Sequence, residues 1–133
     1  MNFKIYIIGK KIDKFFSDAV KEYEKRLTRY CKTQLIYIKN NETLQKKLSD
    51  KSYKIIISNN AELISSEELS DKINKLGISG NSDISIILGN ENLNCDEKLS
   101  ISAMDMNLGL QSVITYEQIY RSYRIINNEP YHK

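Results

Sequence analysis

The segment Ile84-Ser85-Ile86-Ile87-Leu88-Gly89 is a short apolar run that ends in a glycine. It predicts a buried strand followed by a tight turn. Three similar runs lie upstream, at residues 3–8, 34–38 and 53–57. Because residues with helical spacing separate these runs, we predict the order β-α-β-α-β-α-β. The expected fold class is α/β with a largely parallel sheet.

Amphipathic segments fill the intervals between these strands. Apolar residues recur at helical spacing from Ile12 to Tyr30 and predict a helix of about five turns. A short helix is expected at residues 42–48. A third helix should follow Ser65, because Ser65 and Glu68 have the spacing of a capping box and an apolar periodic run comes next.

The first predicted helix also carries a basic face. Such a face is usually a solvated surface, and the alternative is a surface that contacts RNA phosphates. The face comprises Lys14, Lys21, Lys25, Arg26 and Arg29.

Length and composition predict one domain that spans residues 1–133, with 41% hydrophobic and 28% charged residues. The net charge of +3 is too small to argue for nucleic-acid binding by itself. The cysteines Cys31 and Cys95 fit neither a metal-ligand spacing nor a disulfide framework, so no metal is expected. No signal peptide or stretch of roughly 20 apolar residues is visible, which predicts a soluble, cytoplasmic protein without a membrane partner.

Ligands of open parallel sheets bind beyond the carboxyl ends of the strands. Three strand ends are candidates: Ile57-Ser58, Leu88-Gly89, and Met104 at the end of the apolar run Ser100–Met104. A glycine just after a strand lets a ligand approach the backbone, although any tight turn could use one. The chain has no Gly-x-Gly-x-x-Gly and no phosphate-loop lysine motif, so dinucleotide and nucleoside-triphosphate sites lack their fingerprints.

The last predicted helix, at residues 112–126, has three tyrosines on one stripe: Tyr116, Tyr120 and Tyr123. Such a stripe is more typical of a core or a dimer interface than of a surface that stacks on bases. The tail after this helix, residues 127–133, holds the chain's only proline and only histidine. Composition gives no reason for that combination at a terminus.

The stretch Tyr116–Tyr123 and the tail Asn127-Asn128-Glu129-Pro130-Tyr131-His132-Lys133 resemble the C-terminal signature of a bacterial RNA-modifying family. It is the ribosomal RNA large subunit methyltransferase H family, small knotted methyltransferases of the SPOUT class. The resemblance extends over nearly the whole chain. It implies methyl transfer from S-adenosylmethionine to the N3 nitrogen of a pseudouridine in the large-subunit (23S) ribosomal RNA. It also implies a C-terminal trefoil knot and a homodimer.

In proteins of this family, three backbone loops hold S-adenosylmethionine. The resemblance places Ile57 at the end of the third strand and Gly89 in the loop after the fourth. It assigns the knot-side wall to Ile101, Ser102, Ala103, Met104, Asp105 and Met106. Because the sulfonium charge already activates the methyl group, such a site chiefly supplies alignment.

The resemblance also implies catalytic roles for the tail. His132 would take the proton that the acceptor nitrogen loses. Tyr131 would stack on or hydrogen-bond the target base, and Arg121 or Arg124 would hold a phosphate. The alternative for each is a surface tail residue or a helix salt bridge. In the family the tail of one subunit approaches the cofactor of the other.

Several positions depart from the family pattern. A Gly-Gly-x-x-Gly turn is replaced by Gly89-Asn90-Glu91-Asn92-Leu93, a Pro-His pair by Asn107-Leu108, and an arginine by Ser112. The segment between this turn and Ser100 is short, which implies a truncated or missing helix, and the basic loop before the third strand is reduced. These departures leave open a divergent enzyme, or a non-catalytic dimer that binds RNA or the ribosome. An α/β interaction module with neither ligand is a third alternative.

Overall fold

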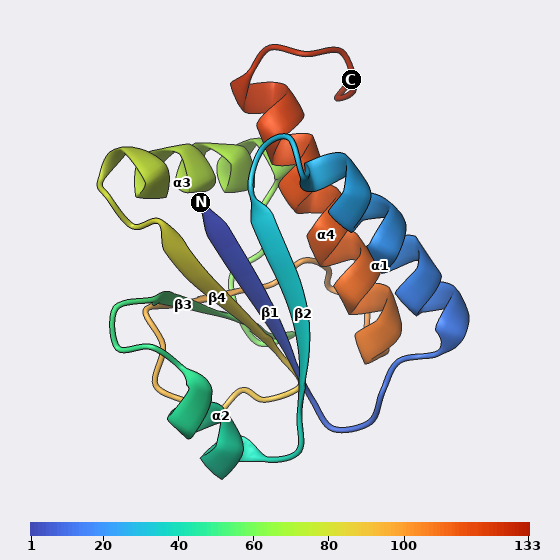
Figure 1. Ribbon diagram of the computed structural model, residues 1–133, viewed down its shortest axis with the longest axis vertical. Coiled ribbons are helices and arrows are strands. Elements are labelled where there is room, and N and C mark those ends of the chain that lie inside the picture. The colour runs from blue at the N-terminus through green and yellow to red at the C-terminus, as the bar shows by residue number, and fades with distance from the viewer.

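The computed structural model describes residues 1–133 and contains one five-stranded sheet in the order β2-β1-β4-β3-β5. All neighbouring strands are parallel, which confirms the predicted class (Figure 1). The strands are β1 (Asn2–Ile8), β2 (Lys32–Ile38), β3 (Tyr53–Ile57), β4 (Asp83–Leu88) and β5 (Glu97–Leu99). The helices are α1 (Lys14–Leu27), α2 (Asn41–Lys47), α3 (Ser66–Ile78) and α4 (Leu108–Ile126).

Side-chain alternation along the strands builds a core on each face of the sheet. Phe3, Ile5 and Ile7 of β1 belong to the larger core, which α1, α3 and α4 cover. Tyr6 belongs to the smaller core on the opposite face, where it joins Leu44 of α2. Figure 1 shows α1 and α4 side by side on the more heavily covered face. None of the helices is both long and apolar enough to cross a membrane.

The predicted capping box at the start of α3 is present. The Glu68 N–H donates to Ser65 Oγ at 3.1 Å, and the Ser65 N–H donates to the Glu68 carboxylate at 3.0 Å. The predicted start of the last helix was wrong, since α4 begins at Leu108 rather than at Ser112. Asn107 is its N-cap, because the Asn107 side chain accepts a hydrogen bond from the Leu110 N–H at 2.8 Å.

The prediction that the run Ser100–Met104 ends a strand was also wrong, since β5 ends at Leu99. The Ser100 N–H donates to the Glu62 carbonyl at 3.0 Å, and the Ile64 N–H donates to the Ser100 carbonyl at 3.0 Å. These bonds use both the N–H and the carbonyl of Ser100. The chain then turns away from the sheet. No helix lies between Gly89 and β5, which confirms the expected loss.

The tyrosine stripe of α4 belongs mainly to the core of the chain itself. Tyr116 is fully buried, and Tyr123 packs edge-on against Phe3 with ring centroids 6.4 Å apart. Tyr30 stacks on the same Tyr123 ring at 5.3 Å. The core interpretation is therefore confirmed for Tyr116 and Tyr123, and neither is available to an interface with a second copy. Tyr120, which is half-buried, contacts Tyr30 and Tyr131 of the tail.

Acidic partners neutralise much of the basic face on α1. Lys14 pairs with Asp18 at 2.9 Å, and Arg26 pairs with Glu22 at 3.3 Å. Arg29 lies 3.5 Å from a carboxylate of the C-terminal tail. Such pairs favour the interpretation as a solvated surface over a dedicated phosphate-binding face.

The contact between α1 and α4 generates a stability prediction. A Cβ at Gly109 would lie 2.2 Å from the Phe16 ring, so Gly109→Ala should destabilise the fold by about 1–3 kcal/mol through overpacking. The matched control is Gly77→Ala in α3, where a Cβ would meet only Met1 Sδ at 3.6 Å. That control should stabilise by a few tenths to about 1 kcal/mol, the helix preference of alanine. Urea unfolding measures both variants, and equal stabilisation by the two would contradict the packing account.

Candidate functional site

A cavity of about 290 Å³ opens at the carboxyl ends of β3 and β4. Its walls bring together Ile57 and Gly89, the two strand-end residues that the sequence predicts for a ligand. The first residues of α4 complete the walls, and no basic side chain lies among them. The lining residues are Ile57, Asn59, Gly89, Asn90, Glu91, Leu108 and Gln111.

Gly89 occupies a position that only glycine can fill. Its φ of +94° lies in the left-handed region, which side chains with a Cβ rarely adopt. A Cβ there would also lie 2.9 Å from the Ile8 carbonyl oxygen and 3.4 Å from Leu108 Cδ1. Ile8 and Leu108 thus fill the side where a Cβ would stand, while Gly89 itself is exposed, so a ligand can approach its backbone from the solvent side.

Glu91 ties the loop after β4 to the loop after β3. The Asn59 N–H donates to Glu91 Oε1 at 3.2 Å, and Asn60 Nδ2 donates to Glu91 Oε2 at 3.1 Å. Hydrogen bonds from Ser58, Asn59 and Asn60 hold the pKa of the Glu91 carboxyl below its usual range. A carboxylate thus stays ionised beside the cavity, and sequence reasoning assigned it no role.

Two of the six residues predicted for the knot-side wall hold side chains of the cavity. Asp105 Oδ1 accepts a hydrogen bond from Asn59 Nδ2 at 2.5 Å. The Met106 carbonyl accepts one from Gln111 Nε2 at 2.7 Å. The 105–106 segment is therefore joined to both sides of the cavity.

The other four predicted wall residues do not line this cavity. Ile101 faces a separate apolar space between the sheet and the helices α3 and α4. Ser102, Ala103 and Met104 form a turn in which the Met104 N–H donates to Ser102 Oγ at 2.9 Å. Met104 is 76% exposed, so this turn projects away from the protein body.

The three residues predicted to be catalytic lie together at the far end of α4. Arg121 Nη1 lies 3.1 Å from His132 Nδ1, and the Arg121 guanidinium lies 5.0 Å from the centroid of the Tyr131 ring. The other ring nitrogen of His132 lies 2.6 Å from Glu67 Oε1 of α3, a partner that sequence reasoning missed. Burial, helped by Tyr23 and the Glu117 carboxylate, raises the pKa of Tyr131 to about 12. Its phenol is therefore a neutral group.

A second set of contacts fixes the tail in place. Tyr30 OH donates to Glu129 Oε1 at 2.6 Å, and Arg124 Nη1 donates to Glu129 Oε2 at 2.9 Å. Arg124 Nη2 donates to the Pro130 carbonyl at 2.8 Å. Asn128, at φ +54°, supplies the left-handed turn that reverses the chain. The tail is thus held against α4 and against Tyr30, which follows α1, rather than left as a loose terminus.

One chain does not bring the cavity and the tail residues together. Leu108 and Gln111 line the cavity at the start of α4, whereas Arg121 lies ten residues beyond Gln111. At 1.5 Å of rise per residue this separation is roughly 15 Å along the helix axis. Figure 1 shows the tail beyond the opposite end of α4.

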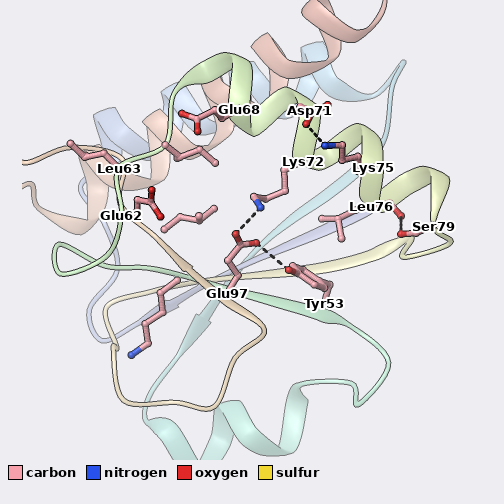
Figure 2. A pocket seen from close by; sticks show the side chains of 13 residues that line it. Tyr53, Glu62, Leu63, Glu68, Asp71, Lys72, Lys75, Leu76, Ser79 and Glu97 are labelled. Atoms are coloured by element: carbon pink, nitrogen blue, oxygen red, sulfur yellow. Dashed lines mark hydrogen bonds and ion pairs between the residues drawn. The ribbon is translucent and has the colours of Figure 1, made fainter.

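A larger groove of about 550 Å³ lies between α3 and β5, and Figure 2 shows its lining. Glu97 in its centre pairs with Lys72 at 2.6 Å and accepts a hydrogen bond from Tyr53 OH at 3.1 Å. Burial, with the Glu97 hydrogen bond, raises the pKa of Tyr53 to about 12. Because these groups satisfy one another and no predicted site residue lines the groove, it is not the candidate site.

No group of three or more His, Cys, Asp or Glu side chains is placed to hold a metal ion.

Comparisons with known proteins agree on one family. The family model described as "Predicted SPOUT methyltransferase" matches residues 1–132. "Ribosomal RNA large subunit methyltransferase H 1" of Thermoanaerobacter sp. (strain X514) is 52% identical over 133 residues, which is all of both chains. "Ribosomal RNA large subunit methyltransferase H 2" of Thermoanaerobacter pseudethanolicus (strain ATCC 33223 / 39E) has the same identity and coverage.

A third relative is longer. "Putative ribosomal RNA large subunit methyltransferase H" of Methanococcus maripaludis (strain C5 / ATCC BAA-1333) is 40% identical over 159 aligned positions that cover all of both chains. The 133 residues of this chain therefore leave gaps against it, whereas the two Thermoanaerobacter proteins share the short form.

The contacts of Glu129 predict how the tail responds to mutation and pH. Glu129→Ala should raise the hydrogen-exchange rates of the tail amides after residue 129 and leave the sheet protected, because the clamp from Tyr30 and Arg124 is lost. The matched control is Asp50→Ala, an exposed acid far from the tail in sequence.

The pH dependence has a definite sign. The Tyr30 hydrogen bond, then the charges of Arg124 and Arg29, lower the pKa of the Glu129 carboxyl. The clamp is therefore complete above the unfolded-state value of 4.5 and is lost as the pH falls through the lower folded-state value. If neither Glu129→Ala nor a fall in pH changes the hydrogen-exchange rates of the tail amides, the clamp does not hold the tail.

Proposed function

The chain belongs to the ribosomal RNA large subunit methyltransferase H family of SPOUT methyltransferases, and from that premise we propose that it methylates a pseudouridine of large-subunit ribosomal RNA at N3. The methyl donor of SPOUT methyltransferases is S-adenosylmethionine. The observation that carries the proposal is 52% identity over the full length of relatives that have the same short form. The shortened loop and missing helix therefore do not set this chain apart from proteins that bear the family name.

The cavity beside Gly89 has the features of a donor site. Gly89 exposes backbone, while Ile57 and Leu108 offer apolar surfaces that suit an adenine ring. Glu91 contributes a negative charge and no lining residue contributes a positive one, which complements a donor that carries a sulfonium. S-adenosylmethionine supplies an activated methyl group, so the residues of the chain need only hold it in line with the acceptor.

The tail has the features of the acceptor side. His132 has the only imidazole of the chain and is proposed to take the proton from the acceptor nitrogen. Tyr131, neutral because of its raised pKa, is proposed to contact the target base rather than to act as a base. Arg121, which borders both rings, is proposed to hold an RNA phosphate.

These two half-sites support a homodimer in which each tail reaches the cavity of the partner subunit. A distance of roughly 15 Å along α4 separates them within one chain. The cavity, at about 290 Å³, is also just below the range of roughly 300–1,000 Å³ typical of ligand pockets, as expected if a second subunit completes it. Phe15 at the start of α1 is 65% exposed, and Leu110 at the start of α4 is also exposed. Covering such side chains would favour association.

We also propose the trefoil knot of the family. The Ser58 N–H donates to the Leu99 carbonyl at 2.9 Å, and the Ser100 N–H donates to the Glu62 carbonyl at 3.0 Å. Residues 99–100 therefore pass between two parts of the loop that follows β3. Such a passage is what threading requires.

Subunit complementation tests the shared site. Gly89→Val should abolish donor binding, and His132→Ala should abolish turnover while donor binding remains. A heterodimer of the two variants keeps one intact site if the tail acts across the dimer. Random re-association of equal amounts should therefore restore about a quarter of the wild-type activity.

The measurement is incorporation of labelled methyl from S-adenosylmethionine into large-subunit ribosomal RNA, before and after the two variants exchange subunits. Isothermal titration with S-adenosylhomocysteine checks donor-site occupancy in each variant. No recovery after verified subunit exchange would show that each tail serves its own cavity. Full activity in either single variant would remove that residue from the site.

A further inference from the structure

Both ring nitrogens of His132 have a partner on a helix. Arg121 Nη1 of α4 lies 3.1 Å from Nδ1, and Glu67 Oε1 of α3 lies 2.6 Å from Nε2. The histidine therefore bridges two helices. Its side chain is 24% exposed, whereas that of Glu67 is 66% exposed, so the ring is the more enclosed member of the pair.

The chemistry of the two partners decides which nitrogen carries the proton. A guanidinium has only N–H donors, so Nδ1 must present its lone pair to Arg121. In the neutral ring the proton then lies on Nε2, which donates it to the Glu67 carboxylate. The hydrogen bond with His132 lowers the pKa of Glu67 below its usual range, so the acceptor is a carboxylate near neutral pH.

We infer that Glu67 is the positioning residue of His132, an inference that rests on the proposed function of the tail. By accepting the Nε2 proton, Glu67 fixes the plane of the ring and leaves Nδ1 as the nitrogen that can act as a base. It also places a negative charge 2.6 Å from the nitrogen that shares the positive charge once the ring is protonated.

Methyl transfer to the acceptor nitrogen then needs no further reactant. The proton leaves the acceptor nitrogen for Nδ1 of His132, and the electron pair of that nitrogen forms the new N–C bond. The electron pair of the broken S–C bond stays on sulfur. The imidazolium that results is stabilised by Glu67 through Nε2.

Arg121 covers Nδ1 until RNA arrives. Its Nε is held by both oxygens of Glu117 at 3.2 Å, while its Nη1 points to His132. A phosphate that draws Nη1 away would free Nδ1 and leave the Glu117 pair in place. Substrate binding and exposure of the base are thereby linked through one side chain.

The neighbouring acidic residues of α3 have other partners than the tail. Glu68 accepts from the Ser65 N–H in the capping box. Asp71 pairs with Lys75 at 2.7 Å. Glu67 is therefore the acid of this helix that can serve the tail, and Asp71→Ala is a control that removes an equal charge from the same helix.

The contact itself is tested by NMR on the wild type, Glu67→Ala and Asp71→Ala. The chain has one histidine, so its ring signals in long-range ¹H–¹⁵N spectra need no assignment between residues. At alkaline pH, where an imidazole is neutral, the wild type and Asp71→Ala should show a slowly exchanging proton on Nε2. Glu67→Ala should lose that signal to exchange with water. A proton on Nδ1, or identical signals in the wild type and Glu67→Ala, would overturn the inference.

The role in turnover is tested with the same variants and Glu67→Gln. Glu67→Ala should lower kcat by about 10- to 100-fold, part of what a general base contributes, while donor and RNA affinities stay within about two-fold. Glu67→Gln should lower kcat by a smaller factor, because the glutamine amide oxygen can still orient the ring although the amide carries no charge. An unchanged kcat in Glu67→Ala would overturn the positioning role. Absence of methyl transfer in the wild type would defeat the proposed function instead, and the NMR result would still test the contact.

Discussion

The backbone pairing of Leu99 and Ser100 with the loop after β3 is the constraint on which the rest of the structure depends. Ser58, Glu62 and Ile64 all exchange hydrogen bonds with this two-residue segment, and Ser100 is almost fully buried. The chain therefore leaves the sheet at one fixed point. From there it makes the exposed turn at residues 102–104, contacts the cavity residues Asn59 and Gln111 through Asp105 and Met106, and reaches Asn107, whose side chain caps α4. The position of the cavity wall and the direction of the last helix both follow from it.

The last helix holds the cavity and the tail at a fixed distance from each other. Its first turn closes the cavity beside Gly89, and its last turns carry Arg121 and Arg124, which fix the tail. Packing of Tyr116 and Tyr123 into the core keeps this spacing constant. A helix that is buried along one side cannot bend to bring its ends together. In the homodimer that we propose, each subunit would offer its tail and receive the tail of the other.

Local signals in the sequence predicted most of the scaffold. Apolar runs located the first four strands, the Ser65 and Glu68 spacing located α3, and the rule for parallel sheets brought Ile57 and Gly89 to one edge. The start of α4 was not predicted because Gly109 interrupts the helix-forming residues. A glycine is needed there because the Phe16 ring packs against the backbone at that position. The contacts of Glu91 and Glu67 were not predicted because their partners lie 31 or more residues away in sequence. No periodicity encodes such contacts.

We propose that two chains jointly form each methyl-transfer site. The most direct measurement is a crystal structure of the protein with S-adenosylhomocysteine. We expect adenine between the loops that contain Ile57 and Gly89, with His132 of the partner subunit facing the sulfur. Adenine bound elsewhere, or a ligand at Gly89 that no residue of a second chain approaches, would contradict it.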